Sequence, residues 1–190
     1  MVTPDIVRDH FSRGLAYDAY VASGTPDQQQ SWRAFGARVA LLPAQRDLVA
    51  SFTRKIHVLI TSGTWCGDCV QQVPMLAAIA GANPLMIHLR LVDRDKHADL
   101  ANLVRICGGL RVPTVIFCNE DFEFLSLAGD KSIARMRAIA ARALGASCPL
   151  PGAPLAADEL AATTQDWVTE FERAHLVARL SAKLRERHGD

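Results

Sequence analysis

The feature that most constrains the fold is a short apolar segment that ends at a glycine and leads straight into a helical pattern. Residues 55–63, KIHVLITSG, have an apolar, β-branched centre, which is typical of a buried strand. The next segment, TWCGDCVQQVPMLAAIA, predicts a helix from Cys66 to about Ala80, closed by Gly81 and an Asn-Pro turn. Two cysteines separated by two residues therefore stand where the strand passes into the helix.

The rest of the central segment predicts a mixed sheet. Residues 85–92 alternate like a second strand, and 93–107 show the apolar face of a helix. A third strand at 114–118 is followed by a short turn and a fourth strand at 122–127, and 131–144 predicts a further helix. A helical crossover favours parallel pairing of the first two strands, while the last two are close enough for a hairpin. The expected fold class is α/β, a mixed central sheet flanked by helices.

Helical patterns lie on both sides of this segment. Residues 4–52 predict helices, with a break at 25–27 and a third helix beginning at Pro43, since proline fits a first helical turn. Residues 156–187 predict one long helical stretch. Its apolar stripe would consist of Leu160, Trp167, Phe171, Ala174, Leu180 and Leu184.

These patterns suggest a domain organisation. We expect a helical extension packed on the core at 1–54, a central domain at 55–144, and a C-terminal helical extension at 155–190. The Gly- and Pro-rich residues 145–154 are interpreted as a linker. The extensions could also form a homodimer, or bind a dedicated partner. Their large apolar side chains are Trp32, Phe35, Trp167 and Phe171.

Composition narrows the classes of function. The net charge of +1 gives no general case for nucleic-acid binding, and no run of about 18 apolar residues predicts a membrane span. The first residues lack the apolar core of a secretory signal, so a cytoplasmic location is expected. In that reducing compartment a Cys-x-x-Cys pair is more often catalytic or metal-binding than a structural disulfide.

The spacing of the pair suits disulfide exchange. Cys66 stands at a helix start, where free N–H groups and the helix dipole stabilise a thiolate and lower its pKa. Cys69 lies one turn later on the same face and can attack a mixed disulfide formed on Cys66. The pair therefore supplies an attacking and a resolving thiol.

Metal binding is the weaker interpretation. A tetrahedral zinc site needs four ligands, and the chain has one short-spaced pair. We predict no metal and no cofactor, because the chain also lacks a phosphate-binding glycine loop and a flavin or nicotinamide fingerprint. The other cysteines, Cys107, Cys118 and Cys148, are scattered with no short-spaced partner, and only His88 and His97 are possible further ligands. Of these, Cys107 and Cys118 are predicted to be small buried residues, with a regulatory role for Cys107 as the alternative, and Cys148 falls in the linker.

Three features together resemble the thioredoxin family. The chain carries WCGDC after a strand, Pro74 five residues past the second cysteine, and RVPT at 111–114. The resemblance covers about 55–144, and the predicted element order is that of the thioredoxin fold. It implies a thioredoxin-like fold with extra N- and C-terminal helices. It also implies a thiol–disulfide oxidoreductase.

The resemblance also implies roles for individual residues. Cys66 would be the nucleophile and Cys69 the resolving cysteine. Pro113 would be a cis-proline beside Cys66, and the Val112 backbone would pair with an extended substrate. Gly129 resembles a glycine after the last strand that lets partners approach. The implied docking surface is therefore Trp65, Val112, Pro113 and Gly129.

The chain departs from the family at two positions. Gly67 and Asp68 stand between the cysteines instead of Gly-Pro, and both are expected to tune the thiol pKa. The Asp68 carboxylate opposes a Cys66 thiolate, while the helix start favours both anions, so the net direction stays open. Ile60 stands where thioredoxins keep a buried aspartate that helps move the proton of the resolving cysteine. Asp68 or water is the expected replacement.

The sequence thus predicts a cytoplasmic oxidoreductase that reduces protein disulfides. Its electrons would come from an unidentified partner reductase or a small thiol, and no nucleic acid or membrane is expected as a partner. The alternative is a thioredoxin-fold interaction or redox-sensing module whose flanking helices bind a partner. A cysteine-based metal carrier is a third, weaker hypothesis.

Overall fold

A four-stranded mixed sheet forms the centre of the molecule. The computed structural model describes residues 2–144 and 157–189. The strand order is β2-β1-β3-β4, with β1 and β2 parallel and the other two pairings antiparallel. The predicted mixed sheet is confirmed, with strand ends shifted by one or two residues. The strands are β1 Ile56–Ser62, β2 Ile87–Asp93, β3 Thr114–Cys118 and β4 Phe124–Gly129.

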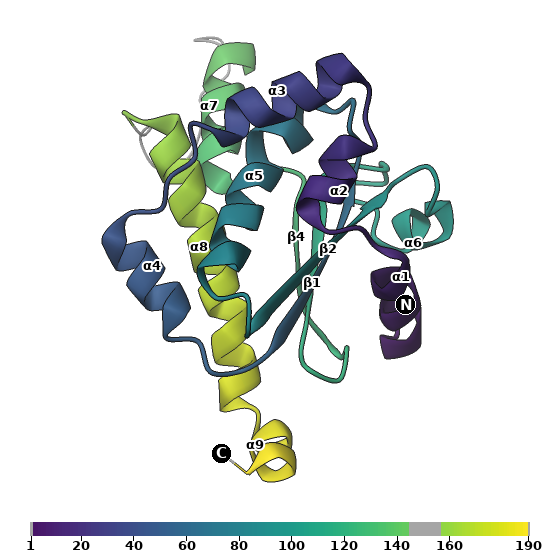
Figure 1. The fold of residues 1–190 in the computed structure, drawn as a ribbon, viewed down its shortest axis with the longest axis vertical. Helices are drawn as coiled ribbons and strands as arrows, with labels where there is room; N and C mark the ends of the chain where they lie inside the picture. The colour runs from purple at the N-terminus through teal and green to yellow at the C-terminus, as the bar shows by residue number, and fades with distance from the viewer. Residues whose placement is uncertain (1, 145–156, 190) are drawn as a thin grey trace.

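Helices cover both faces of this sheet (Figure 1). Those that follow strands are α5 Gly67–Ala82, α6 Ala98–Leu103 and α7 Ile133–Leu144. Those at the ends of the chain are α1 Pro4–Arg13, α2 Tyr17–Ala22, α3 Pro26–Gly36, α4 Pro43–Ala50, α8 Glu159–Leu180 and α9 Ala182–His188. No helix in the part of the chain that the structure describes is long and apolar enough to cross a bilayer.

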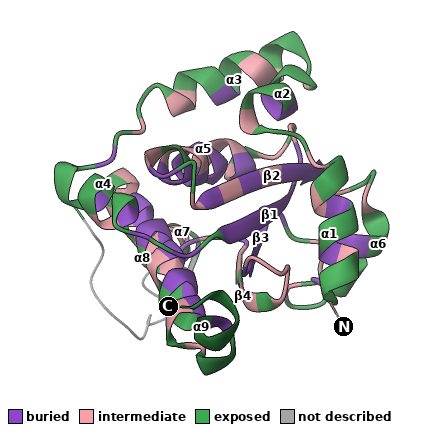
Figure 2. Ribbon diagram, turned by 60° about the horizontal axis from the view of Figure 1, so that its bottom comes forward, coloured by how far each residue is buried: buried purple, intermediate pink, exposed green. Residues whose placement is uncertain are grey.

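Strand β1 is buried along its whole length, because alternate side chains enter two cores. Ile56, Val58 and Ile60 point into the larger core, which lies between the sheet and α5. Leu59 points into a smaller core on the opposite face, built with α1 and α6. Figure 2 shows the buried strands enclosed between these helical layers.

The larger core extends into both terminal segments. Trp32 of α3 is buried there with Val73 of α5 and Trp167 of α8. Phe171, also on α8, packs edge-on against Phe117 of β3 at a centroid distance of 5.1 Å. These aromatic side chains of the added helices therefore pack in the core of the protein itself.

Prolines and threonines explain where the N-terminal helices begin. Thr3 precedes Pro4, and its hydroxyl accepts a hydrogen bond from the Ile6 N–H. Thr25 precedes Pro26 and forms a reciprocal capping box with Gln28. The expected breaks at 25–27 and Pro43 therefore occur.

The first expected helix is split, which corrects the sequence-based prediction. Between α1 and α2, Leu15 exchanges two backbone hydrogen bonds with Leu91 of β2, at 2.8 and 2.9 Å. Gly14 permits this approach, since a Cβ there would lie 2.8 Å from the Arg90 Cβ. The helix ends at Gly14, and the pairing with the sheet fixes the chain at that point.

The helix predicted over 93–107 is also shorter, being confined to α6. The Asp93 carboxylate accepts hydrogen bonds from the N–H groups of Asp95 and Lys96, which stabilises a turn before the helix. After α6, Ile106 pairs with Gly109. Cys107 sits at the tip of this turn with φ 48° and is exposed, so its predicted burial is wrong.

The C-terminal segment forms two helices instead of one. Ser181 has extended backbone dihedral angles, and its hydroxyl accepts a hydrogen bond from the Leu184 N–H at the start of α9. Leu180 was predicted to belong to the apolar stripe, but it is 79% exposed, so that part of the prediction is wrong. The predicted linker 145–154 and Cys148 lie outside the described residues.

Candidate active site

The two cysteines lie at the corner between β1 and α5. The strand ends at Ser62, and Cys66 caps the helix with extended backbone angles. The Cys66 N–H donates to the Gly63 carbonyl at 3.0 Å. Gly63 is required to be small, because a Cβ there would lie 2.7 Å from the Trp65 indole. The corner is thus a tight turn covered by an aromatic ring.

The N-terminal helices support this corner. The Trp32 indole N–H donates to the Thr64 carbonyl at 2.9 Å. Tyr20 of α2 packs edge-on against Trp32 at 5.8 Å between ring centroids. Both side chains are buried. The turn that carries the dithiol therefore rests on residues far upstream of the strand.

Cys66 has the properties of a nucleophile. Its side chain is half-buried, and the protonated thiol donates to the Val112 carbonyl at 3.6 Å. The Cys69 thiol and the N–H groups of Cys69 and Asp68 lower the pKa of Cys66 to about 6, although burial opposes ionisation. The sequence left the direction of the Cys66 pKa shift open, and in the structure the pKa is lowered. With a pKa of about 6, Cys66 is largely a thiolate at neutral pH.

Cys69 has the opposite character. It is completely buried on α5. Burial and then the neighbouring Cys66 raise the pKa of Cys69 well above the ordinary thiol value. Both cysteines are free thiols in this structure. The corner therefore holds one ionised, accessible sulfur beside one protonated, enclosed sulfur.

Asp68 is neutralised by two cations from α7 and the loop before it. Arg135 donates to its Oδ1 from Nε and Nη2 at 3.1 and 2.8 Å, and Lys131 Nζ lies 2.9 Å from Oδ2. Burial acts against ionisation of Asp68, but hydrogen bonds from Arg135 and then Lys131 lower the pKa of its carboxyl. A carboxylate held in this way is a poor base.

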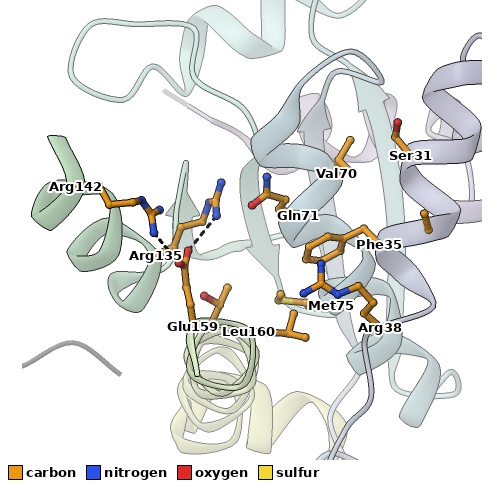
Figure 3. A pocket seen from close by; sticks show the side chains of 12 residues that line it. Ser31, Phe35, Arg38, Val70, Gln71, Met75, Arg135, Arg142, Glu159 and Leu160 are labelled. Carbon is orange, nitrogen blue, oxygen red and sulfur yellow. Dashed lines mark hydrogen bonds and ion pairs between the residues drawn. The ribbon is translucent and has the colours of Figure 1, made fainter. Parts of the chain in front are cut away.

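Arg135 also links Asp68 to Glu159 of α8, and Figure 3 shows the ion pairs on Glu159. Arg135 and Arg142 both contact Glu159, at 3.2 and 3.1 Å. Beside them lies a cavity of about 690 Å³ between α3, α5, α7 and α8. Figure 3 shows its apolar wall formed by Phe35, Val70, Met75 and Leu160.

The Val112–Pro113 loop lies against Cys66. Its peptide bond is cis, and the Val112 carbonyl accepts the hydrogen bond from the Cys66 thiol. Gly129 of β4 lies directly behind this loop with φ 131°, and a Cβ there would lie 2.4 Å from the Pro113 carbonyl oxygen. Glycine is needed at 129 for packing within the chain.

Trp65 forms the exposed rim of the site. Its side chain is 51% exposed, and the Arg94 guanidinium lies over its ring at 4.7 Å. Arg94 is held there by the Leu110 carbonyl at 3.2 Å. The structure therefore brings Trp65, Cys66, Val112 and Pro113 together, with Gly129 behind Pro113 and Asp68 directed toward α7.

Sequence reasoning missed several residues of the site. Lys131 and Arg135 reach Asp68 from a distant segment, and their spacing of four positions was the only signal. Tyr20 and Ser62 contribute buried hydroxyl groups near Cys69. For Ser62, the one available signal was its position on the same face of the strand as Ile60.

The other cysteines and the histidines lie apart from the dithiol. Cys118 is fully buried in β3, and burial raises its pKa to about 12. His97 pairs with His10 across 2.7 Å between their Nδ1 atoms. Among residues 2–144 and 157–189, no group of three or more His, Cys, Asp or Glu side chains is arranged to hold a metal ion.

Comparison with known proteins identifies the family. The thioredoxin family model matches residues 14–133, beginning within the segment predicted as an extension. No curated protein matches the chain. A Pseudomonas aeruginosa protein of unknown function superposes with a TM-score of 0.66 at 17% identity, covering 89% of this chain and 94% of its own. An HIV epitope-scaffold superposes with a TM-score of 0.68 at 17% identity, covering 92% and 98%.

These solved structures share the fold, and the family match covers most of the chain, including the Cys66–Cys69 corner, Val112 and Pro113. The chain belongs to the thioredoxin family.

Proposed function

We propose that this protein is a thiol–disulfide oxidoreductase that reduces protein disulfides through Cys66 and Cys69. The observation that carries the proposal is the contrast between the two thiols. Cys66 is accessible and has a pKa lowered to about 6, whereas Cys69 is buried and has a raised pKa. Attack requires a thiolate, and release of the substrate requires a second thiol within reach.

The reaction has two steps. The Cys66 thiolate attacks one sulfur of a substrate disulfide, which breaks the S–S bond and leaves a mixed disulfide; the departing thiolate takes up a proton. Cys69 then loses its proton and attacks the Cys66 Sγ, forming the Cys66–Cys69 disulfide and releasing the second substrate thiol. Two electrons pass to the substrate, and a partner dithiol protein or a small thiol must return them.

The surroundings of Cys66 suit an extended peptide. The Val112 carbonyl points toward the sulfur, so a substrate strand could pair with this backbone as an added β-strand. Trp65 and Arg94 offer an apolar and cationic rim beside it. A protein disulfide in an extended segment fits this arrangement, and a reducing compartment such as the cytoplasm would favour the reductive direction.

The two alternative functions have less support. The aromatic side chains expected to mark a partner surface, Trp32, Trp167 and Phe171, are buried in the chain's own core, although Leu176, Val177 and Leu180 of α8 are exposed. A metal carrier would need further ligands near the dithiol. No such group occurs in the described part of the chain.

A redox titration tests the proposal. The protein would be equilibrated in glutathione or dithiothreitol buffers, alkylated, and analysed by mass. We expect a reversible Cys66–Cys69 disulfide with a potential near or below the cytosolic value of about −220 to −320 mV. A markedly higher potential would indicate an oxidant or sensor. Absence of a reversible bond would refute the oxidoreductase.

A further inference from the structure

Two buried hydroxyl groups lie on the inner side of the dithiol. Ser62 follows Ile60 on the face of β1 that packs against α5, and it is completely buried. Tyr20 of α2 is 1% exposed and belongs to the same core as Cys69. Neither hydroxyl has a formed hydrogen bond within the described residues. Native proteins rarely leave such groups unpaired, so two beside a reactive sulfur point to a role.

The Ser62 hydroxyl lies near both the Tyr20 hydroxyl and the Cys69 thiol. The Ser62 hydroxyl is close enough to both neighbours to lower the pKa of Tyr20 and that of Cys69, although burial raises both. The raised pKa of Tyr20 keeps its hydroxyl protonated and able to donate. Ser62 can thus donate to the Cys69 sulfur while it accepts from Tyr20.

We propose that Ser62 is the hydrogen-bond donor to the Cys69 thiolate, and that Tyr20 is a positioning residue that acts through Ser62. Together they would serve the resolving cysteine in place of the carboxylate that thioredoxins keep at the position of Ile60. This inference rests on the proposed function. Negative charge develops on the Cys69 sulfur only during resolution, so unpaired donors beside it are a preorganised site for that charge.

The resolving step conserves atoms and electrons. The Cys69 thiol gives its proton to solvent, and the resulting thiolate accepts a hydrogen bond from the Ser62 hydroxyl. Its sulfur attacks the Cys66 Sγ, so the Cys66–Cys69 bond forms and the bond from Cys66 to the substrate breaks. The substrate thiolate leaves and takes up a proton. The hydroxyl groups transfer no electrons and are unchanged at the end.

The other ionisable groups near Tyr20, Ser62 and Cys69 are as follows. Asp68 is turned away toward Lys131 and Arg135. Cys66 lies across the dithiol, and Asp93, at the end of β2, raises the pKa of Tyr20. Tyr20 also lines a cavity of about 310 Å³ whose charged or titratable residues are Arg13, Asp93, Lys96 and His97. These groups are common to the parent and the variants below.

The chain offers a matched pair of variants. Its two tyrosines, Tyr17 and Tyr20, both lie on α2 and both pack against Trp32. Burial and then Asp18 raise the pKa of Tyr17, and neither Ser62 nor a cysteine acts on it, whereas Ser62, Cys69 and Cys66 all act on Tyr20. Tyr20→Phe therefore removes the proposed hydroxyl, and Tyr17→Phe makes the same chemical change at a control position.

The measurement is the lifetime of the mixed disulfide on Cys66 after mixing with a small protein disulfide, across pH values spanning the ordinary thiol pKa of about 8.5. We expect Tyr20→Phe to slow resolution at neutral pH by roughly 3- to 10-fold, the effect of losing a hydrogen bond in a charged network. The midpoint of its pH profile should move upward. Formation of the mixed disulfide should be unchanged, and Tyr17→Phe should match the parent.

Ser62→Ala provides a second test. It should slow resolution at least as much as Tyr20→Phe, and the double variant should be no slower than Ser62→Ala alone, because Tyr20 acts through Ser62. Parent-like pH profiles in both single variants would overturn this inference alone. A parent protein that never forms the Cys66–Cys69 disulfide would overturn the proposed function and this inference with it.

Discussion

The dithiol lies between two unlike environments. On the α7 side, the carboxylate of Asp68 is surrounded by Lys131 and Arg135, and the ion pairs continue to Glu159. On the α2 side, the groups near Cys69 are the uncharged hydroxyls of Tyr20 and Ser62. The charged side is partly exposed, with the Asp68 side chain 26% and the Arg135 side chain 12% exposed, whereas Tyr20 and Ser62 are buried.

This difference separates the control of the two sulfurs. Asp68 would oppose a Cys66 thiolate, but its charge is compensated, so the Cys69 thiol and backbone N–H groups determine the lowered pKa of Cys66. Cys69 is buried, and burial and then Cys66 raise the pKa of its thiol, which keeps it protonated at neutral pH. The two environments therefore shift the pKa values of Cys66 and Cys69 in opposite directions.

The largest expected effect comes from replacing the sulfurs one at a time. Cys66→Ser should abolish disulfide reduction, because no nucleophile remains. Cys69→Ser should still attack and then hold the substrate as a stable mixed disulfide. Intact-mass analysis after mixing with a disulfide substrate distinguishes the two. An adduct on the Cys66→Ser protein, at Cys69, would mean that the assigned roles are reversed.

The next effect concerns the charged side. Arg135 is 12% exposed and joins Asp68 to Glu159, so Arg135→Gln should lower the free energy of unfolding by about 1–3 kcal/mol. Arg142→Gln is the matched control, since Arg142 contacts the same Glu159 but is 63% exposed and does not touch Asp68. Arg142→Gln should lower the free energy of unfolding by only about 0–1 kcal/mol. Denaturant unfolding of both variants measures the difference, and equal losses would contradict a special role for the Asp68 contact.

The two cysteines at the centre of this site could be predicted from the sequence, but the residues that surround them could not. The strand, the helix start and the Cys-x-x-Cys spacing are local signals, and they suffice to place Cys66 and Cys69 together at one corner of the fold. The thioredoxin resemblance added Pro113. By contrast, Arg135 reaches Asp68 across 67 positions of the chain, and Tyr20 lies near Cys69 only because α2 packs into the same core as α5.

The misplaced elements have a similar cause. The break after α1 depends on a backbone pairing between Leu15 and Leu91, which no local pattern reveals. Cys107 was expected to be buried because free cysteines usually are, but a turn closed by Ile106 and Gly109 turns it outward. In each case a contact or turn geometry outweighed a local preference.

A third effect is the pH dependence of stability in the reduced protein. The folded pKa of Cys66 is about 6, below the ordinary value of 9.0. The folded state therefore binds fewer protons between these values, so stability should rise with pH over this window and be lost as pH falls through 6. After allowance for solvent screening of this half-exposed group, we expect about 1–2 kcal/mol.

Thermal or denaturant unfolding under reducing conditions measures this contribution, with Cys66→Ser as the comparison. The variant lacks the titrating thiol, so its stability should change less over the same window. Parallel curves for parent and variant would show that Cys66 is not shifted. Cys69 does not contribute over most of this window, because its thiol is protonated in both the folded and the unfolded state until the pH approaches the ordinary value of 9.0.

The smallest effect is expected from Asp68→Asn. This variant distinguishes most directly between the influence of Asp68 on the dithiol and that of the Tyr20 and Ser62 hydroxyls. Removing this charge lowers the pKa of Cys66 further, since the carboxylate opposes the thiolate and its two cations are left uncompensated. At pH 6 about half of the Cys66 thiols are already ionised, so the alkylation rate can rise by less than about twofold. The pH profile of resolution by Cys69 should stay unchanged, because the paired carboxylate is a poor base. A resolution profile that shifts in Asp68→Asn but not in Tyr20→Phe would assign the proton transfer to the charged side and reverse the comparison.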